Sequence, residues 1–317
     1  MKPPKISRRV LLFGTAASTV VLCRCKSKGP LTDAHVSVVK ARAYSDDLFD
    51  LVRRLFVQHR LAVKGKRVVL KPNLVEFDAA STINTHPLVV HAALEAVRAL
   101  GAAEVRIAEG PGHRRLTLDL AEEAGYFSTI PKFEDLFTDL NLDQVARRKF
   151  LSPISKLSEL YLPHTVLGCD LLISLPKMKT HHWAGATLSM KNLFGMVPGG
   201  VYGWPKNVLH WAGIHECIAD LHRTVRNGFA LVDGIDAMEG NGPIQGKAKH
   251  MGVLVAGKDM VAVDATCCNM MEIDAGKVEY LRLADISRRR IHQLAENPAK
   301  LRTRFELVPS LDALRLA

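Results

Sequence analysis

Short apolar segments alternate with amphipathic segments along most of this 317-residue chain, and this alternation restricts the fold more than any other feature. The apolar segments predict strands over residues 35–41, 67–75, 104–110, 170–177, 229–240 and 251–259. The amphipathic segments predict helices over residues 46–61, 86–101, 116–125, 184–197, 209–226, 260–273 and 277–293. Strands that alternate with helices of this length are typical of βαβ units. We therefore predict an α/β fold with a mostly parallel sheet, arranged as one large domain or as two lobes.

Residues 1–30 have the pattern of an export signal, which leaves 31–317 for the α/β domain. The pair Arg8-Arg9 precedes an apolar run, Val10 to Leu22, that is too short to span a bilayer comfortably. The segment "SRRVLL" resembles a twin-arginine signal, and a Sec signal is the alternative. We expect the twin-arginine export machinery as a partner and a location in the periplasm or on the outer face of the cytoplasmic membrane. We expect membrane contact only through this segment. Three fates remain open for it: cleavage, lipidation at Cys23 or retention.

The charge and the cysteines exclude several classes of protein. Residues 1–28 hold seven of the basic residues and no acidic residue, so the formal net charge of +11 falls to +4 without them. A nucleic-acid binder concentrates basic residues on one face, so we expect no nucleic-acid partner. Residues 288–290 are three arginines, which we interpret as a solvated face of the last predicted helix. No cysteine belongs to a Cys-x-x-Cys pair, so the sequence has no iron–sulfur or zinc-ribbon motif.

Polar residues follow several of the predicted strands at the point where each strand ends. In parallel sheets, ligands bind beyond the carboxyl ends of the strands. The residues at these positions are Lys71, Asn73, Glu109, His113, Lys177, Lys179, Asp233 and Asp259. Their shared position predicts one polar site at one edge of the sheet.

The stretch from residue 174 to residue 200 is the most informative part of the chain. It contains Lys177, Lys179 and Lys191 beside apolar residues, and no acidic residue lies between Lys177 and Lys206. Removing an ammonium group from water without a partner costs several kcal/mol, so these lysines need an anion. Backbone N–H groups at the start of the predicted helix 184–197 add to such a site. The alternative is that the lysines point into solvent.

The remaining candidate residues suit ligand binding and proton transfer. With Lys71, Lys177, Lys179 and Lys191, the amides of Asn73 and Asn192 are candidates for holding a cofactor or substrate. The catalytic candidates are His113, His181, His182 and Asp233, where Asp233 acts as a general base or orients a lysine. His113 and His182 are the candidate metal ligands, although no local spacing such as His-x-x-x-His supports them. Asp264 is read as a residue that opens or caps the helix over 260–273.

Several motifs together resemble one protein family. They are "VVLKPNLV", "THP", "AEG", "LPKMKTH", "SMKNLFG", "LVDGIDAMEGNGP" and "AGKDMVAVDAT", in this order between residues 35 and 275. The chain is identified from them as a member of the domain-of-unknown-function 362 family. Many members of that family carry a further segment with iron–sulfur motifs, which this sequence lacks.

A weaker similarity points to the nickel-pincer lactate racemase family. The segments "IAEGPGHRRLT" and "HHWAGATLSMKNLFGMVPG" are similar to two segments of those enzymes. The resemblance implies that His113 acts on substrate, that His181 or His182 is the second histidine, and that Lys191 carries the pincer nucleotide. The sequence departs from that pattern in having Leu-Ser-Met before Lys191 and Gly112 before His113.

Two functions of different class remain open at this point. The first is an enzyme with a cleft for a carboxylate- or phosphate-bearing molecule, performing metal-assisted isomerase or redox chemistry. The second is a non-catalytic periplasmic binding protein for a small anion or a metal. A divalent metal and a nucleotide-derived cofactor both stay open, and a small anionic molecule is the expected partner.

Overall fold

The computed structural model describes residues 30–317, and the predicted export signal, with Cys23, lies outside the described residues. Residues 31–317 form one compact unit. Within the described part of the chain, no helix has both the length and the apolar character needed to cross a membrane.

The unit combines one large sheet, a small two-stranded sheet and helices that are mostly short. The strands are β1 (Thr32–Lys40), β2 (Arg67–Pro72), β3 (Glu104–Glu109), β4 (Phe137–Asp139), β5 (Val145–Lys149), β6 (Glu159–Pro163), β7 (Leu171–Leu175), β8 (Lys177–His181), β9 (Gly185–Thr187), β10 (Gly228–Asn241), β11 (Gln245–Gly257) and β12 (Arg289–Ala295). The α-helices are α1 (Leu48–Gln58), α2 (Pro87–Ala99), α3 (Thr117–Glu123), α4 (Tyr126–Thr129), α5 (Phe133–Leu136), α6 (His164–Gly168), α7 (Gly199–Tyr202), α8 (Asn207–Trp211), α9 (Ile214–Thr224), α10 (Met260–Met270) and α11 (Glu279–Leu283). The 3₁₀ helices are η1 (Lys191–Met196), η2 (Ile286–Arg288), η3 (Pro298–Leu301) and η4 (Pro309–Leu314).

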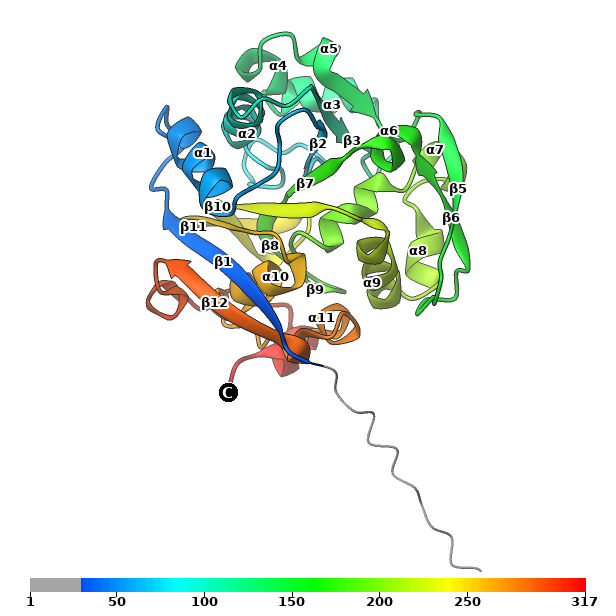
Figure 1. Cartoon of the computed structure of the whole chain (residues 1–317). Coiled ribbons are helices and arrows are strands. Elements are labelled where there is room, and N and C mark those ends of the chain that lie inside the picture. The colour runs from blue at the N-terminus through cyan, green and yellow to red at the C-terminus, as the bar shows by residue number, and fades with distance from the viewer. Residues whose placement is uncertain (1–29) are drawn as a thin grey trace, which may run out of the picture. The chain divides into compact units, whose positions relative to one another are not determined.

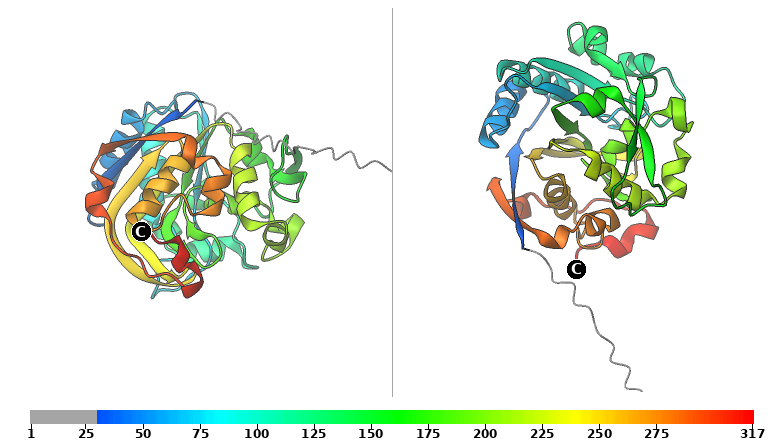
Figure 2. Two further views of the ribbon diagram at one scale, coloured as in Figure 1. Left: turned by 90° about the horizontal axis from the view of Figure 1, so that it is seen from below. Right: turned by 45° about the vertical axis from the view of Figure 1, so that its right-hand side comes forward.

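The large sheet has the strand order β12-β1-β11-β10-β7-β2-β3-β4 (Figure 1). Strands β10, β7, β2, β3 and β4 pair in parallel, so their carboxyl ends lie at one edge. The hairpin of β10 and β11 is antiparallel and forms a long curved pair, drawn in yellow in Figure 2. Strand β8 lies off the main path and pairs with β10 and β9. The predicted α/β fold with a mostly parallel sheet is confirmed.

The sheet separates two hydrophobic cores because successive side chains of a strand point to opposite faces. On β2, Val68 and Leu70 belong to one core and Val69 belongs to the other. The first core packs under α1 and α2, and the second packs against α9 and α10, on the other side of the sheet (Figure 1). Both faces of the central strands are therefore buried, as expected for parallel strands covered by helices.

Two predicted helices are wrong. Residues 184–197 form β9 and the 3₁₀ helix η1, because Thr187 pairs with Lys179 of β8 and Gly185 adopts a φ of +84°. The helix predicted over 277–293 ends at Leu283, and Arg289–Ala295 pairs in parallel with β1 as β12. Pairing with another part of the chain overrode local helical preference in both segments. The helix N-terminus that was expected to bind an anion near residue 184 therefore does not exist.

Smaller differences concern the helix boundaries. The helix predicted over 209–226 is divided into α8 and α9 at Gly213, whose φ is +108°. Asp259 caps α10 by accepting from the backbone N–H of Ala262 at 3.0 Å. Asp264 lies inside α10 and is not its cap.

Candidate functional site

A buried ion pair lies where β2 and β3 end. The Lys71 amine and the Glu109 carboxylate are in direct contact and are almost completely buried. Lys71 Nζ also donates to Pro72 O at 3.1 Å and to Asn192 Oδ1 at 3.3 Å. Because the two strands are parallel neighbours, their carboxyl ends bring these two side chains together.

The 3₁₀ helix η1 is attached to this ion pair and to α10. Asn192 donates from Nδ2 to Lys71 O and to Ser174 Oγ, each at 3.1 Å. The turn before η1 is held by the buried carboxylate of Asp264, which accepts from the N–H groups of Ser189 (2.8 Å) and Met190 (3.0 Å). Burial raises the pKa of Asp264 to about 7, against the opposing effect of these hydrogen bonds. The backbone at Lys191 is thus held by Asp264 on the N-terminal side and by Asn192 on the C-terminal side.

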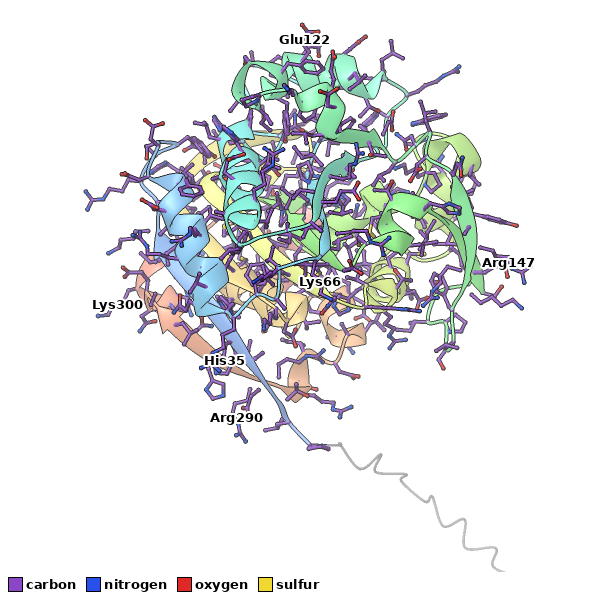
Figure 3. All side chains as sticks on the ribbon, turned by 45° about the horizontal axis from the view of Figure 1, so that its top comes forward. His35, Lys66, Glu122, Arg147, Arg290 and Lys300 are labelled. Atoms are coloured by element: carbon purple, nitrogen blue, oxygen red, sulfur yellow. The ribbon has the colours of Figure 1, made fainter. Side chains whose placement is uncertain are left out.

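A cavity of about 110 Å³ opens beside the ion pair. The polar residues that line it are Asn73, Glu109, Lys179, His181, Thr187, Lys191, Asn192, Lys206 and His210. Charged side chains elsewhere, such as those of Glu122, Arg147 and Lys300, are exposed and project from the surface (Figure 3). The cavity lysines are different, since Lys179 is 0% exposed and Lys206 is 3% exposed.

The lining contains more positive than negative charge. Glu109 is the one carboxylate among the residues that line the cavity, and Lys71 already neutralises it. Lys179 Nζ donates to Ile83 O at 2.8 Å and to Pro243 O at 3.1 Å, and Lys206 Nζ donates to Gly110 O at 2.5 Å. Both amines are therefore satisfied by neutral backbone carbonyls. An anion in the cavity would supply the missing charge.

Burial shifts the pKa values of these amines downward. Burial, together with the nearby ammonium of Lys71, lowers the pKa of Lys191 to about 7. Burial lowers the pKa of Lys206 to about 7 as well, although Glu109 opposes the shift. The pKa of Lys179 lies well below its ordinary value because of burial and because of the positive charges of Lys191 and Lys177. Near neutral pH, Lys191 and Lys206 are therefore poised between the charged and neutral forms.

Lys191 differs from its neighbours in its contacts. No hydrogen-bond partner for its amine occurs among residues 30–317, and Nζ instead lies 3.9 Å from the centre of the Phe194 ring. The Lys191 amine is partly accessible and lines the cavity. It is consequently available to a ligand.

His181 presents a fixed donor to the same cavity. Its Nδ1 accepts hydrogen bonds from the N–H groups of Trp183 at 3.1 Å and Ala184 at 3.2 Å. Burial and the positive charge of Lys191 lower the pKa of His181 well below its ordinary value. The ring is therefore neutral and carries its proton on Nε2. Burial also lowers the pKa of His210, another lining residue.

Two buried oxygen atoms of the lining have no partner. They are Oδ1 of Asn73 and Oγ1 of Thr187, which find none among the described residues, and both residues are more than nine-tenths buried. Buried polar atoms without a partner are uncommon in folded proteins. A ligand with a hydrogen-bond donor would satisfy Asn73, and a donor or an acceptor would satisfy Thr187.

Lys177 and Asp233 form a separate pair outside this lining. Lys177 Nζ lies 2.6 Å from Asp233 Oδ2, and the Tyr44 hydroxyl donates to Asp233 Oδ1 at 3.0 Å. The backbone N–H of His86 adds a hydrogen bond of 2.9 Å to Asp233. Lys177 borders a second cavity, of about 240 Å³, with Tyr44 and His86. Two residues from the predicted set are thus paired with each other and do not line the cavity beside Lys71 and Glu109.

His113 and His182 also lie outside the cavity lining. His113 is exposed in the loop after β3, and His182 places Nδ1 2.8 Å from Gly242 O. In the described part of the chain, no group of three or more His, Cys, Asp or Glu residues is arranged to hold a metal ion. Of the residues that the racemase resemblance implies, His181 and Lys191 line the cavity together, whereas His113 does not. Sites for drug-sized ligands measure about 300–1,000 Å³, and the cavity of about 110 Å³ is smaller than that range.

The cavity lining contains four of the predicted binding residues, Asn73, Lys179, Lys191 and Asn192. It also contains His181, which was predicted as catalytic. Lys71 does not line the cavity but contacts Glu109, which does. Sequence reasoning missed Lys206, His210 and Thr187. Lys206 is the last lysine of the interval without acidic residues that begins at Lys177. This position in the sequence is the one signal that could have indicated Lys206.

A model of the family "Domain of unknown function (DUF362)" matches residues 68–269, which include every residue that lines the cavity. The chain belongs to the DUF362 family. The family recognised from the motifs is thereby confirmed. The chain is also similar to a thylakoid-associated protein of Synechocystis sp., at 28% identity over 220 residues. That match covers 68% of this chain and 65% of the relative, slightly less than two thirds of its length.

Two solved structures resemble this DUF362 chain at 13% sequence identity each. One is the lactate racemase apoprotein from Thermoanaerobacterium thermosaccharolyticum, with a TM-score of 0.46 over 77% of this chain and 57% of that one. The other is a protein from Thermotoga maritima, with a TM-score of 0.42 over 79% of this chain and 59% of that one.

The close packing of Gly195 against the ion pair gives a first prediction. A Cβ atom at Gly195 would overlap Glu109 Oε1 and Lys71 Nζ. We expect Gly195→Ala to separate the buried pair and to lower the free energy of unfolding by about 3 kcal/mol or more, the range for breaking a buried pair. Urea denaturation measures this. Gly112→Ala is the control, because its nearest neighbouring atom lies 4.0 Å from the added Cβ. Equal stability of the two variants would contradict the packing described.

The lowered pKa of Lys191 gives a second prediction. An ordinary lysine has a pKa near 10.5 and Lys191 has one near 7, so the unfolded chain binds more protons between these values. The contribution of Lys191 to stability is therefore present above about pH 10.5 and is lost as the pH falls through about 7. Urea denaturation from pH 7 to pH 10 measures it as the difference between the wild type and Lys191→Met. We expect this difference to change with pH, whereas the exposed Lys300→Met variant should parallel the wild type throughout. A Lys191→Met curve that also parallels the wild type would contradict the shift.

Proposed function

We propose that this protein is an enzyme that binds a small carboxylate- or phosphate-bearing molecule in the cavity and moves a proton at a carbon next to the acid group. The observation that carries the proposal is the imbalance of charge in the lining. The buried Lys179 and Lys206 and the partly exposed Lys191 line a cavity whose one carboxylate is already paired with Lys71. A structural role alone would not require so many desolvated amines at one place.

The residues divide into two roles. Lys206 and Lys179 are held by backbone carbonyls, so they are fixed counter-charges for the acid group of the ligand. Lys191 suits the role of a base near neutral pH, because a base works best when its pKa lies near the working pH. His181 stays neutral because burial and the positive charge of Lys191 lower its pKa. His181 Nε2–H can donate to an oxygen of the substrate, and neutral Lys191 can take a proton.

The size of the cavity limits the ligand. An engineered cavity of about 150 Å³ holds one benzene molecule, which has six non-hydrogen atoms. A cavity of about 110 Å³ suits a small acid or a phosphate-sized group.

We also propose that the protein acts outside the cytoplasm after twin-arginine export. Support comes from the Arg8-Arg9 pair and the apolar run that follows it. The relative from Synechocystis is described as thylakoid-associated, and a location close to a membrane would be in keeping with that description.

A non-catalytic binding protein for a small anion is the second candidate. The observation in its favour is that Lys179 and Lys206 are already fixed by carbonyls, as in a preformed binding site. The two candidates share the cavity and differ in whether Lys191 moves a proton.

Anion affinity should depend on pH in a way that both candidates share. An amine with a pKa near 7 must take up a proton before it can neutralise an anion. We expect the Kd for sulfate, whose charge is constant over this range, to rise about tenfold per pH unit above pH 7 for each such amine. Calorimetry from pH 6 to pH 9 measures this. Lys206→Met should weaken binding, and Lys300→Met should not. A Kd that is independent of pH would contradict the proposed site.

Proton transfer separates the two candidates. We expect the enzyme, in deuterated water, to exchange the hydrogen on the carbon next to the carboxylate in at least one of a panel of small 2-hydroxy and 2-amino acids. Proton NMR follows the loss of that signal. Lys191→Met should abolish the exchange while the protein stays folded by circular dichroism. Binding of these acids without any exchange would support the non-catalytic candidate instead.

A further inference from the structure

We propose that Lys191 forms an imine with a small 2-oxo acid whose carboxylate is held by Lys206 in the same cavity. This inference rests on the proposed function for the acid-binding cavity and goes beyond it in the reaction, because a 2-oxo acid has a carbonyl group and no hydrogen on the carbon next to its carboxylate. The ligand combines the two groups for which the cavity has partners, an acid group and a carbonyl group.

The contacts of the four lysines in and beside the cavity single out Lys191. Lys71 is occupied by Glu109, Pro72 O and Asn192. Lys179 and Lys206 each donate to backbone carbonyls. The Lys191 amine has neither a carboxylate nor a hydrogen-bond partner among residues 30–317, and lies over the Phe194 ring. Its lone pair can therefore reach a carbonyl carbon in the cavity once the amine is neutral.

The surroundings of Lys191 favour the neutral amine, which is the nucleophilic form. Desolvation and a neighbouring cation are the two features that activate lysines for imine formation. Both act here, since Lys191 is desolvated and the Lys71 ammonium lies nearby. With a pKa of about 7, Lys191 has a neutral fraction at pH 7 roughly a thousandfold larger than that of an ordinary lysine.

The reaction balances without any further reactant. The Lys191 nitrogen attacks the carbonyl carbon, and one amine hydrogen moves to the carbonyl oxygen to give a carbinolamine. The carbon–oxygen bond then breaks, and the oxygen leaves as water with the second amine hydrogen. The products are one imine and one water molecule. No electrons are transferred between groups, so no oxidant or reductant is needed.

The unpaired oxygen atoms fit the carbinolamine intermediate. This intermediate carries a hydroxyl group that is absent from the 2-oxo acid. Asn73 Oδ1 lines the cavity without a donor, and Thr187 Oγ1 lines it without any partner among the described residues. A hydroxyl formed on the ligand would supply the donor for one of them. His181 Nε2–H is a donor for the leaving oxygen.

The test is reductive trapping of the full-length protein with pyruvate and cyanoborohydride. We expect one reduced adduct per chain by intact mass, and peptide mapping should place it on Lys191. Labelling of Lys191 at pH 7 should be at least tenfold faster than labelling of exposed Lys300, because the neutral fractions differ so widely. Propionate, which has the acid group but no carbonyl, should slow the labelling and give no adduct.

Variants and binding data separate the possible outcomes. Lys191→Met should abolish the adduct, and Lys206→Met should keep it on Lys191 but require more pyruvate. Because the adduct is mapped on the wild type, the test does not depend on a variant that fails to fold. If calorimetry shows that pyruvate and propionate bind but Lys191 is not labelled ahead of Lys300, the imine inference is overturned and the proposed function stands. If neither acid binds, both are overturned.

Discussion

The buried ion pair between Lys71 and Glu109 is the interaction on which the rest of the site depends. It joins the carboxyl ends of β2 and β3, and Asn192 hydrogen-bonds to it from η1. The ion pair also uses the one carboxylate of the cavity lining. Lys191 and Lys206 consequently have no internal counter-charge, and burial lowers their pKa values to about 7. The contact between Lys71 and Glu109 thus joins the ends of β2 and β3 and leaves the neighbouring lysines without a negative partner.

The sheet could be predicted because the residue pattern that indicates each strand lies within that strand. Strands β2, β3 and β7 are apolar runs that fill both cores, and α1 and α2 have apolar residues at helical spacing. The segments predicted wrongly are those in which distant contacts decide the structure. The β9–η1 turn follows from the carboxylate of Asp264, 75 residues away in the sequence from Ser189. Likewise, β12 exists because β1, from the other end of the domain, offers it an edge. The helix or strand propensity of a short segment carries no information about a distant partner such as Asp264 or β1.

The residues of the candidate site could be predicted from the sequence about as far as the sheet could. The rule that ligands bind at the carboxyl ends of parallel strands identified Lys71, Asn73 and Glu109. The acid-free interval identified Lys179 and Lys191. Neither signal could separate Lys177 from Lys179, which lie two residues apart on the same strand. The separation depends on Asp233 of β10, which lies opposite Lys177 in the register of the two strands. Sequence alone does not give that register.

The different partners of these two lysines explain how one strand can serve two purposes. A carboxylate neutralises the Lys177 ammonium, so Lys177 can stabilise the packing of β8 on β10 without attracting an external anion. Backbone carbonyls satisfy the hydrogen bonds of Lys179 but carry only partial charge, so the positive potential remains in the cavity. Replacing an acidic partner by carbonyls therefore leaves a lysine without a counter-charge. The same reasoning applies to Lys206, whose amine rests on Gly110 O and not on Glu109. In this chain, the choice between carboxylate and carbonyl at each amine determines where positive charge remains unbalanced.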